Sequence, residues 1–131
     1  MGWALPIDPA VRGIHMGDIT ELGNIVAGAF ARPDEAGHGE YLPLVGDFMS
    51  FNEIADTLNR LGHKFSFKQV STEVFAASFP GAAEVAATFS YFQAYTYLGS
   101  DSRDQIALAN RIAGRQPTPF VTWARANFQV R

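Results

Sequence analysis

The longest helical pattern in the chain, residues 81–98, is apolar on two sides. One side carries Val85, Phe89 and Phe92, and the other carries Ala87, Tyr91, Tyr95 and Leu98. A helix that is apolar nearly all round is normally buried on both sides. Because a chain of 131 residues usually builds one core, we expect a partner chain or a ligand to cover the second side.

Periodicity and capping residues predict an α+β fold that is mostly helical, with five to six helices and two or three short strands. We expect a single domain over residues 1–131, which opens with an extended arm over residues 1–12. The predicted strands are residues 13–17, 41–45 and 65–70. The helices are expected to begin after Asp18 or Thr20, Ser50, Ser71 or Thr72, Gly81, Asp101 and Thr118, and four of them to end at Pro33, Gly62, Gly99 and Gly114.

Two apolar stripes support these helices. Ser50 and Glu53 have the spacing of a capping box, in which each residue satisfies a free backbone N–H of the other. Behind them, the predicted buried stripe is Phe51, Ile54, Ala55 and Leu58. In the first helix, the stripe expected to face the core is Leu22, Ile25, Val26, Ala29 and Phe30.

Composition excludes several classes of function. The net charge is −3 and the only lysines are Lys64 and Lys68, so that we expect no nucleic-acid partner. There is no cysteine, which excludes disulfides and thiolate metal sites. The apolar runs are too short to span a bilayer, and we expect a cytoplasmic protein without a membrane partner.

The chain contains no complete catalytic or cofactor-binding motif. Gly37-His-Gly39 is the nearest approach to a dinucleotide-binding turn, and it precedes a predicted strand instead of following one. Tyr91 is followed four residues later by Tyr95, where a short-chain reductase has lysine. His15, His38 and His63 lie far apart, without a metal-ligand spacing. No catalytic, cofactor-binding or metal-ligating residue is therefore assigned, and the sequence argues against an enzyme acting alone.

Two residue types leave alternatives open. Asp47 follows Gly46 at a predicted strand end, where ligands often bind, but a turn residue ahead of the Ser50 cap is the favoured interpretation. The tyrosines Tyr91, Tyr95 and Tyr97 line either an aromatic pocket or, as is more common for aromatic residues at helical spacing, a packing surface.

Several runs resemble the NmrA-like family of atypical short-chain dehydrogenase/reductases. They include the Phe-Pro-Gly-Ala-Ala motif at residues 79–83, and together they are residues 15–23, 41–55, 59–63, 75–85 and 117–128. The resemblance covers nearly the whole chain but only the C-terminal half of the family's α/β fold. It implies a Rossmann half with nicotinamide nucleotide in full-length members, whereas nothing here matches that half.

The resemblance implies that the aromatic residues on the substrate or partner side include Phe75, Phe79, Tyr91 and Tyr95. With Leu98 from the long helix, these are the candidate ligand or interface residues. We expect a non-catalytic binding or assembly module that forms a homodimer or higher homo-oligomer, without a cofactor. The alternatives are the substrate-side half of a split NAD(P)-dependent reductase, completed by a separate Rossmann-domain protein, and a protein that binds a small apolar ligand in an aromatic pocket.

Overall fold

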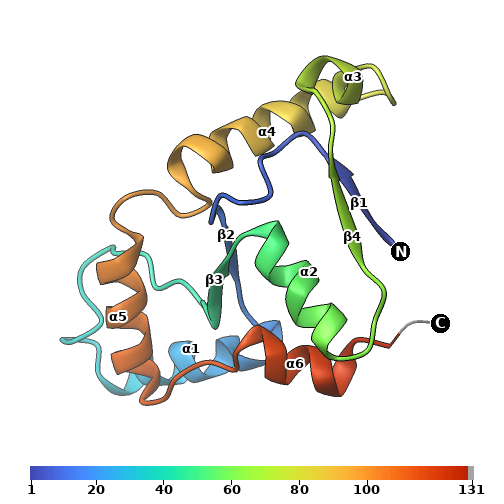
Figure 1. Ribbon diagram of the computed structural model, residues 1–131. Helices are drawn as coiled ribbons and strands as arrows, with labels where there is room; N and C mark the ends of the chain where they lie inside the picture. The colour runs from blue at the N-terminus through green and yellow to red at the C-terminus, as the bar shows by residue number, and fades with distance from the viewer. Residues whose placement is uncertain (130–131) are drawn as a thin grey trace. The chain divides into compact units, whose positions relative to one another are not determined.

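The computed structural model describes residues 1–129, which contain six α-helices, a short 3-10 helix and four short strands (Figure 1). The predicted α+β, mostly helical fold class is confirmed. The chain forms two compact units. The first unit comprises residues 1–14, 48–97 and 129, and the second comprises residues 15–47 and 98–128.

A parallel pair of strands organises the first unit. Strand β1 (Gly2–Leu5) pairs with β4 (Ser66–Gln69), and their register runs from Gly2 opposite Ser66 to Leu5 opposite Gln69. The N-terminal segment was predicted to be an extended arm. It is extended, and residues 2–5 form a strand because β4 supplies backbone partners that sequence periodicity does not reveal.

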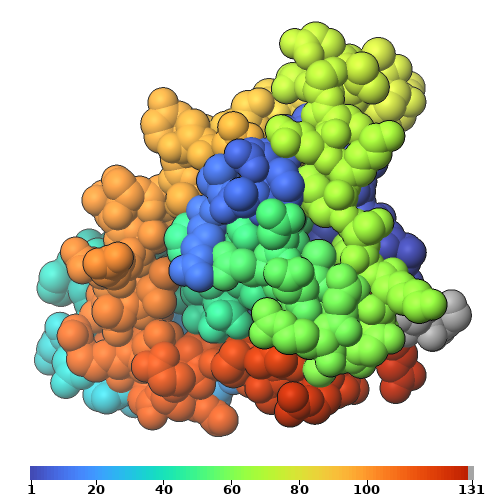
Figure 2. Space-filling view, in the orientation of Figure 1, coloured from blue at the N-terminus to red at the C-terminus, as the bar shows by residue number. Residues whose placement is uncertain are grey.

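Helix α2 (Phe51–Arg60) begins as the capping box predicts. The Glu53 N–H donates to Ser50 Oγ at 3.2 Å, and the Ser50 N–H donates to Glu53 Oε1 at 3.1 Å. All four residues of the predicted stripe are buried, and Gly62 ends the helix with a φ of 95°. Helix α2 and β4 pack side by side, in green and yellow-green in Figure 2.

Aromatic rings fill the space between this helix and the sheet. Trp3 contacts Phe51 and Phe65 edge to face, with ring centroids 5.2 and 4.6 Å apart. Phe51 also stacks on Phe67 with a centroid distance of 5.1 Å. These rings join β1, α2 and β4, which are separated in sequence, into one core.

Helices α3 (Thr72–Ala76) and α4 (Ala82–Tyr95) complete the first unit. Helix α4 ends three residues before the predicted Leu98, because Thr96 turns out of the helix with a φ of 66° and Tyr97 donates its N–H to the Gly13 carbonyl at 2.9 Å. The predicted side of Val85, Phe89 and Phe92 faces the core only in part. Phe89 and Phe92 are half-buried, and Phe89 contacts Phe51 with ring centroids 6.2 Å apart, whereas Val85 is exposed and the fully buried residues are Ala82 and Ala86.

The second unit is built around two helices. The 3-10 helix η1 (Ile19–Glu21) is capped by Asp18 and leads into α1 (Leu22–Ala31), which packs against α5 (Ser102–Ala113). Only Ile25 of the predicted α1 stripe is buried, whereas Leu22, Val26 and Phe30 are exposed. The reason is that α5 approaches α1 at Gly28, where a Cβ would overlap the Ile112 carbonyl oxygen. Close approach through glycine leaves the larger residues outside.

The remaining elements correct one predicted strand and one predicted cap. A second sheet pairs β2 (Ile14–Met16) with β3 (Asp47–Met49), whereas residues 41–45 form no strand. Pro43 in that segment lacks an N–H to donate to a neighbouring strand. Helix α6 (Phe120–Asn127) starts after Pro119, and its first N–H donates to the Asp47 carboxylate at 2.6 Å instead of being capped by Thr118.

Candidate functional site

Four of the five candidate residues form two ring pairs in the first unit. Phe75 on α3 contacts Phe79 edge to face, with ring centroids 5.6 Å apart. Tyr91 and Tyr95, one turn apart on α4, have ring centroids 5.1 Å apart. At a rise of about 1.5 Å per residue, the tyrosines lie towards the end of α4 and Phe79 lies before its start. The structure therefore forms two separate pairs rather than one cluster.

Leu98, the fifth candidate, does not share a helix face with the tyrosines. Helix α4 ends at Tyr95, and Leu98 belongs to the second unit. The sequence suggested a longer helix because Gly99 is a plausible stop and Tyr97 and Leu98 are apolar. The backbone turn at Thr96 has no comparable signature in the sequence.

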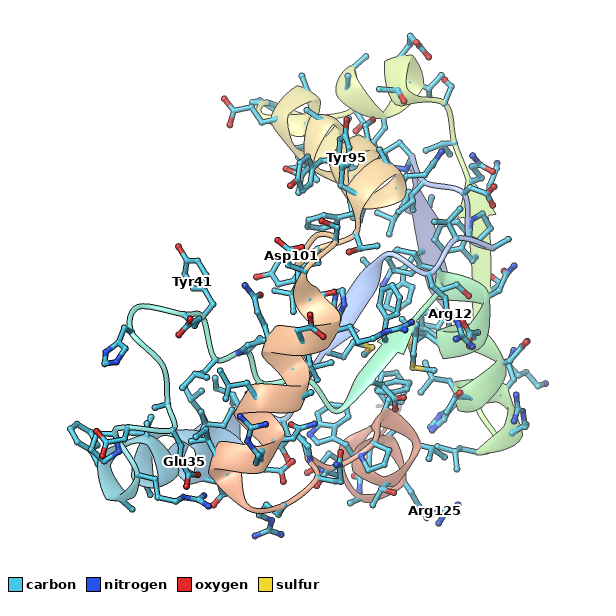
Figure 3. All side chains as sticks on the ribbon, turned by 90° about the vertical axis from the view of Figure 1, so that its left-hand side faces the viewer. Arg12, Glu35, Tyr41, Tyr95, Asp101 and Arg125 are labelled. Carbon is cyan, nitrogen blue, oxygen red and sulfur yellow. The ribbon has the colours of Figure 1, made fainter. Side chains whose placement is uncertain are left out.

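The outer face of α4 is aromatic and nearly uncharged. Tyr91 and Tyr95 are 52% and 63% exposed, and Figure 3 shows Tyr95 near the end of the helix. With Ala87 they form a row at every fourth residue, which we call the tyrosine ridge. Glu84 is the only charged residue in α4. This face therefore presents aromatic surface without the charges that usually keep an exposed helix face hydrated.

A groove runs beside the tyrosine ridge. Ser90 and Ala94, each one residue before a ridge tyrosine, line a cavity of about 310 Å³. The rest of its wall is formed by Gln93, Pro6 and residues 69–72. We call this cavity the α4 groove. Its wall contains neutral polar groups. Gln93 accepts a hydrogen bond from the Asp8 N–H at 2.9 Å, and the Ser71 hydroxyl accepts one from the Val74 N–H at 3.2 Å.

Sequence reasoning missed the residues of this groove. Ser90 and Ala94 are small, and they break the apolar pattern on which helix faces are assigned. The only sequence feature that could have indicated them is their spacing of four residues, with each one directly before Tyr91 or Tyr95. Pro6 and Gln69 reach the groove through the pairing of β1 with β4, which the sequence did not predict.

The other polar residues considered in the sequence have structural positions. His15 lies in β2, where burial lowers its pKa, while His38 lies in the loop before β3 and His63 follows α2. Asp47 holds the start of α6, which is neither of the roles weighed for it. Within residues 1–129 no group of three or more His, Asp or Glu side chains is arranged to hold a metal ion.

The sequence model of the NmrA-like family matches residues 1–118. Among curated proteins, none matches the chain. In the part of the chain that the structure describes, no helix is both long enough and apolar enough to cross a membrane.

Proposed function

Because the chain belongs to the NmrA-like family, we propose that it is a non-catalytic binding and assembly module that forms a homodimer through α4. The observation that carries this proposal is the tyrosine ridge lying directly beside the α4 groove. A ridge and a groove on one face make that face complementary to a second copy of itself.

Helix geometry favours this pairing. Side chains four residues apart form ridges, and two helices commonly cross at about −50° when such ridges fit into each other's grooves. Ala87, Tyr91 and Tyr95 form the ridge, while Ser90 and Ala94 form the adjacent row of small residues. In a two-fold dimer the ridge of each copy meets the groove of the other, so that one contact is made twice.

The chemistry of the groove also fits a tyrosine. Pro6, Val70 and Ala94 offer apolar surface for the ring, while Ser90 and Gln93 offer hydrogen-bonding groups for the hydroxyl. A buried tyrosine needs such a partner for its hydroxyl. The volume of about 310 Å³ is ample for one ring, since a dry cavity of about 150 Å³ takes a benzene molecule.

The lack of charge on this face favours a second copy over a charged partner. Complementary charge is what steers charged partners to a surface, and α4 offers only Glu84. Fully burying a side chain of this size contributes about 1.5–3 kcal/mol relative to leaving it in water. Tyr91 and Tyr95 are 52% and 63% exposed, so each of the four tyrosines of a dimer would gain about half of this.

The proposal is tested by measuring molar mass with light scattering after size exclusion, at micromolar protein concentration. The wild type should have the mass of two chains. Tyr95→Glu should have the mass of one chain, because the dimer would bury an unpaired carboxylate, whereas Tyr95→Phe should remain dimeric. Val74→Glu is the matched control, since Val74 is also an exposed apolar residue of the first unit and lies on α3.

A second variant separates loss of the contact from loss of the fold. Ala94→Trp fills the α4 groove without adding charge and should also give a single chain. Circular dichroism of each variant should match that of the wild type. A folded wild type with the mass of one chain would refute the homodimer.

We also propose that the chain corresponds to the C-terminal half of the family's fold. It is supported by the motifs at residues 79–83 and 117–128 and by the lack of a glycine-rich dinucleotide turn in the 131 residues. The split-reductase and apolar-ligand alternatives stay predictions.

A further inference from the structure

A small cavity lies in the second unit, whereas the tyrosine ridge and the α4 groove belong to the first unit. Its volume is about 130 Å³. Two rings of α6, Phe120 and Trp123, lie in its wall and are stacked on one another, with centroids 6.2 Å apart and planes 21° apart. The rest of the wall comes from the end of β2 and from the residues that precede α6, namely Met16, Gly17, Asp18 and Thr118.

Carboxylates occupy the backbone donors at this cavity. The Phe120 N–H donates to Asp47 Oδ2 at 2.6 Å, and the Thr118 N–H donates to Glu21 Oε1 at 2.8 Å. A helix start with free N–H groups attracts anions. Here the two donors beside the cavity already have anionic partners, so that the start of α6 does not offer them to a bound anion.

The charge around the cavity is negative. Asp18 lies in the wall, where its Oδ1 accepts hydrogen bonds from the Thr20 hydroxyl at 2.7 Å and the Thr20 N–H at 3.0 Å. The Thr20 hydroxyl, followed by the Thr20 N–H, lowers the pKa of Asp18, so that this carboxylate is ionised at neutral pH. The ion pairs Arg12–Glu53 and Arg32–Glu35 do not involve Asp18, Glu21 or Asp47.

We propose that this cavity binds a small quaternary ammonium group. Aromatic faces attract such cations through the ring quadrupole, and their methyl groups suit apolar walls. The Asp18 carboxylate supplies the counter-charge that a neutral apolar ligand would leave without a partner. A dry cavity of about 150 Å³ holds a benzene molecule, so a cavity of about 130 Å³ limits the ligand to a compact group such as tetramethylammonium.

The test compares three compact probes that each carry methyl groups on one central atom and that differ in charge. They are tetramethylammonium, neutral tert-butanol and the trimethylacetate anion. The chain has two tryptophans, so their indole N–H resonances report the site directly in ¹⁵N spectra, and a Trp3→Phe variant assigns the signal of Trp123. Ionic strength is held constant with sodium chloride.

Tetramethylammonium should shift the Trp123 signal with saturation and bind more tightly than tert-butanol, while trimethylacetate should bind least. Asp18→Asn should weaken tetramethylammonium binding by about two- to fivefold, the range of an exposed ion pair, and leave tert-butanol binding unchanged. Asparagine retains an oxygen acceptor for both hydrogen bonds from Thr20, so that the turn into α1 is preserved. Phe120→Leu should weaken tetramethylammonium binding by removing one of the two rings, and it leaves the Trp123 signal in place as the readout.

Two results would overturn the proposal. One is a Trp123 signal that moves no more with tetramethylammonium than with sodium chloride. The other is equal affinity of wild type and Asp18→Asn for tetramethylammonium. Neither result bears on the α4 dimer, which lies in the other unit.

Discussion

Two glycines of α1 should respond in opposite directions to the same substitution. A Cβ on Gly28 would overlap the Ile112 carbonyl oxygen, which is fixed in the backbone of α5. A Cβ on Gly23 would have nothing within 4 Å. Both glycines lie in the helix without a positive φ, so alanine fits the backbone at either position. The pair therefore isolates the packing of α1 on α5 from helix propensity.

The magnitudes follow from these two environments. Replacing glycine by alanine within a helix stabilises it by about 0.5–1 kcal/mol. Gly23→Ala should raise the free energy of unfolding by about 0.5 kcal/mol, the lower end, because it lies near the start of α1. Gly28→Ala makes the same gain but must displace α5, and overfilling a packed site costs about 1–3 kcal/mol. Its net effect should be a loss of about 0.5–2 kcal/mol.

Urea denaturation followed by far-ultraviolet circular dichroism measures both changes. The denaturation midpoint should rise for Gly23→Ala and fall for Gly28→Ala, with similar slopes. If Gly28→Ala were stabilised as much as Gly23→Ala, α5 would not approach α1 at this glycine. The account of why Leu22, Val26 and Phe30 remain exposed would then fail with it.

Two further predictions concern the start of α2. Ser50→Ala should destabilise the protein by about 0.5–2 kcal/mol in urea denaturation, because the cap at the Glu53 N–H is lost, and an unchanged midpoint would contradict that cap. Arg12 donates two hydrogen bonds to Glu53 and lowers the pKa of this carboxyl from 4.5 to about 2. The ion pair therefore contributes fully to the free energy of unfolding above pH 4.5, and this contribution is lost as the pH falls towards 2. Glu53→Gln should therefore cost about 1 kcal/mol at pH 7, a value reduced for the solvent exposure of the pair, and almost nothing at pH 2. A difference that does not change between these pH values would contradict the ion pair.

Local signals in the sequence predicted local structure well. The capping box of Ser50 and Glu53 forms as expected, and Gly62 and Gly114 end their helices with positive φ angles of 95° and 73°. Such features depend on residues within one turn of each other. The residues that interact are therefore close together in the sequence. The local hydrogen bonds and backbone preferences that predict a helix end also stabilise it in the folded protein.

Features that depend on distant residues were missed. Thr118 was expected to cap α6. The first N–H of the helix, that of Phe120, instead donates to Asp47, which lies 73 positions away in the sequence. The N-terminal segment is a strand only because β4 pairs with it. The cavity proposed for the ammonium group likewise combines residues 16–18 with residues 118–123. Neither composition nor period indicates such pairs, because both are properties of neighbouring residues.

Periodicity also left the inner side of the helices undetermined. It identified apolar sides on α1 and α4, but the residues buried there are Ile25 in α1 and Ala82 and Ala86 in α4. Both sides of these helices are apolar, so the period alone does not say which side faces the core. Small residues decide this, because they allow a neighbouring backbone to come close.

The burial of small residues in place of large ones raises the question of what role the exposed aromatic side chains have. Alanines take buried positions on four helices, at Ala55, Ala82, Ala109 and Ala124, while Phe30 and Tyr95 are 84% and 63% exposed. Folding of each unit does not need these large side chains, since its own packing leaves them in water. Contiguous exposed apolar surface on a protein commonly marks a site of interaction. This exposed surface therefore supports the proposal that the tyrosine ridge and the adjacent α4 groove pair with a second copy of the chain.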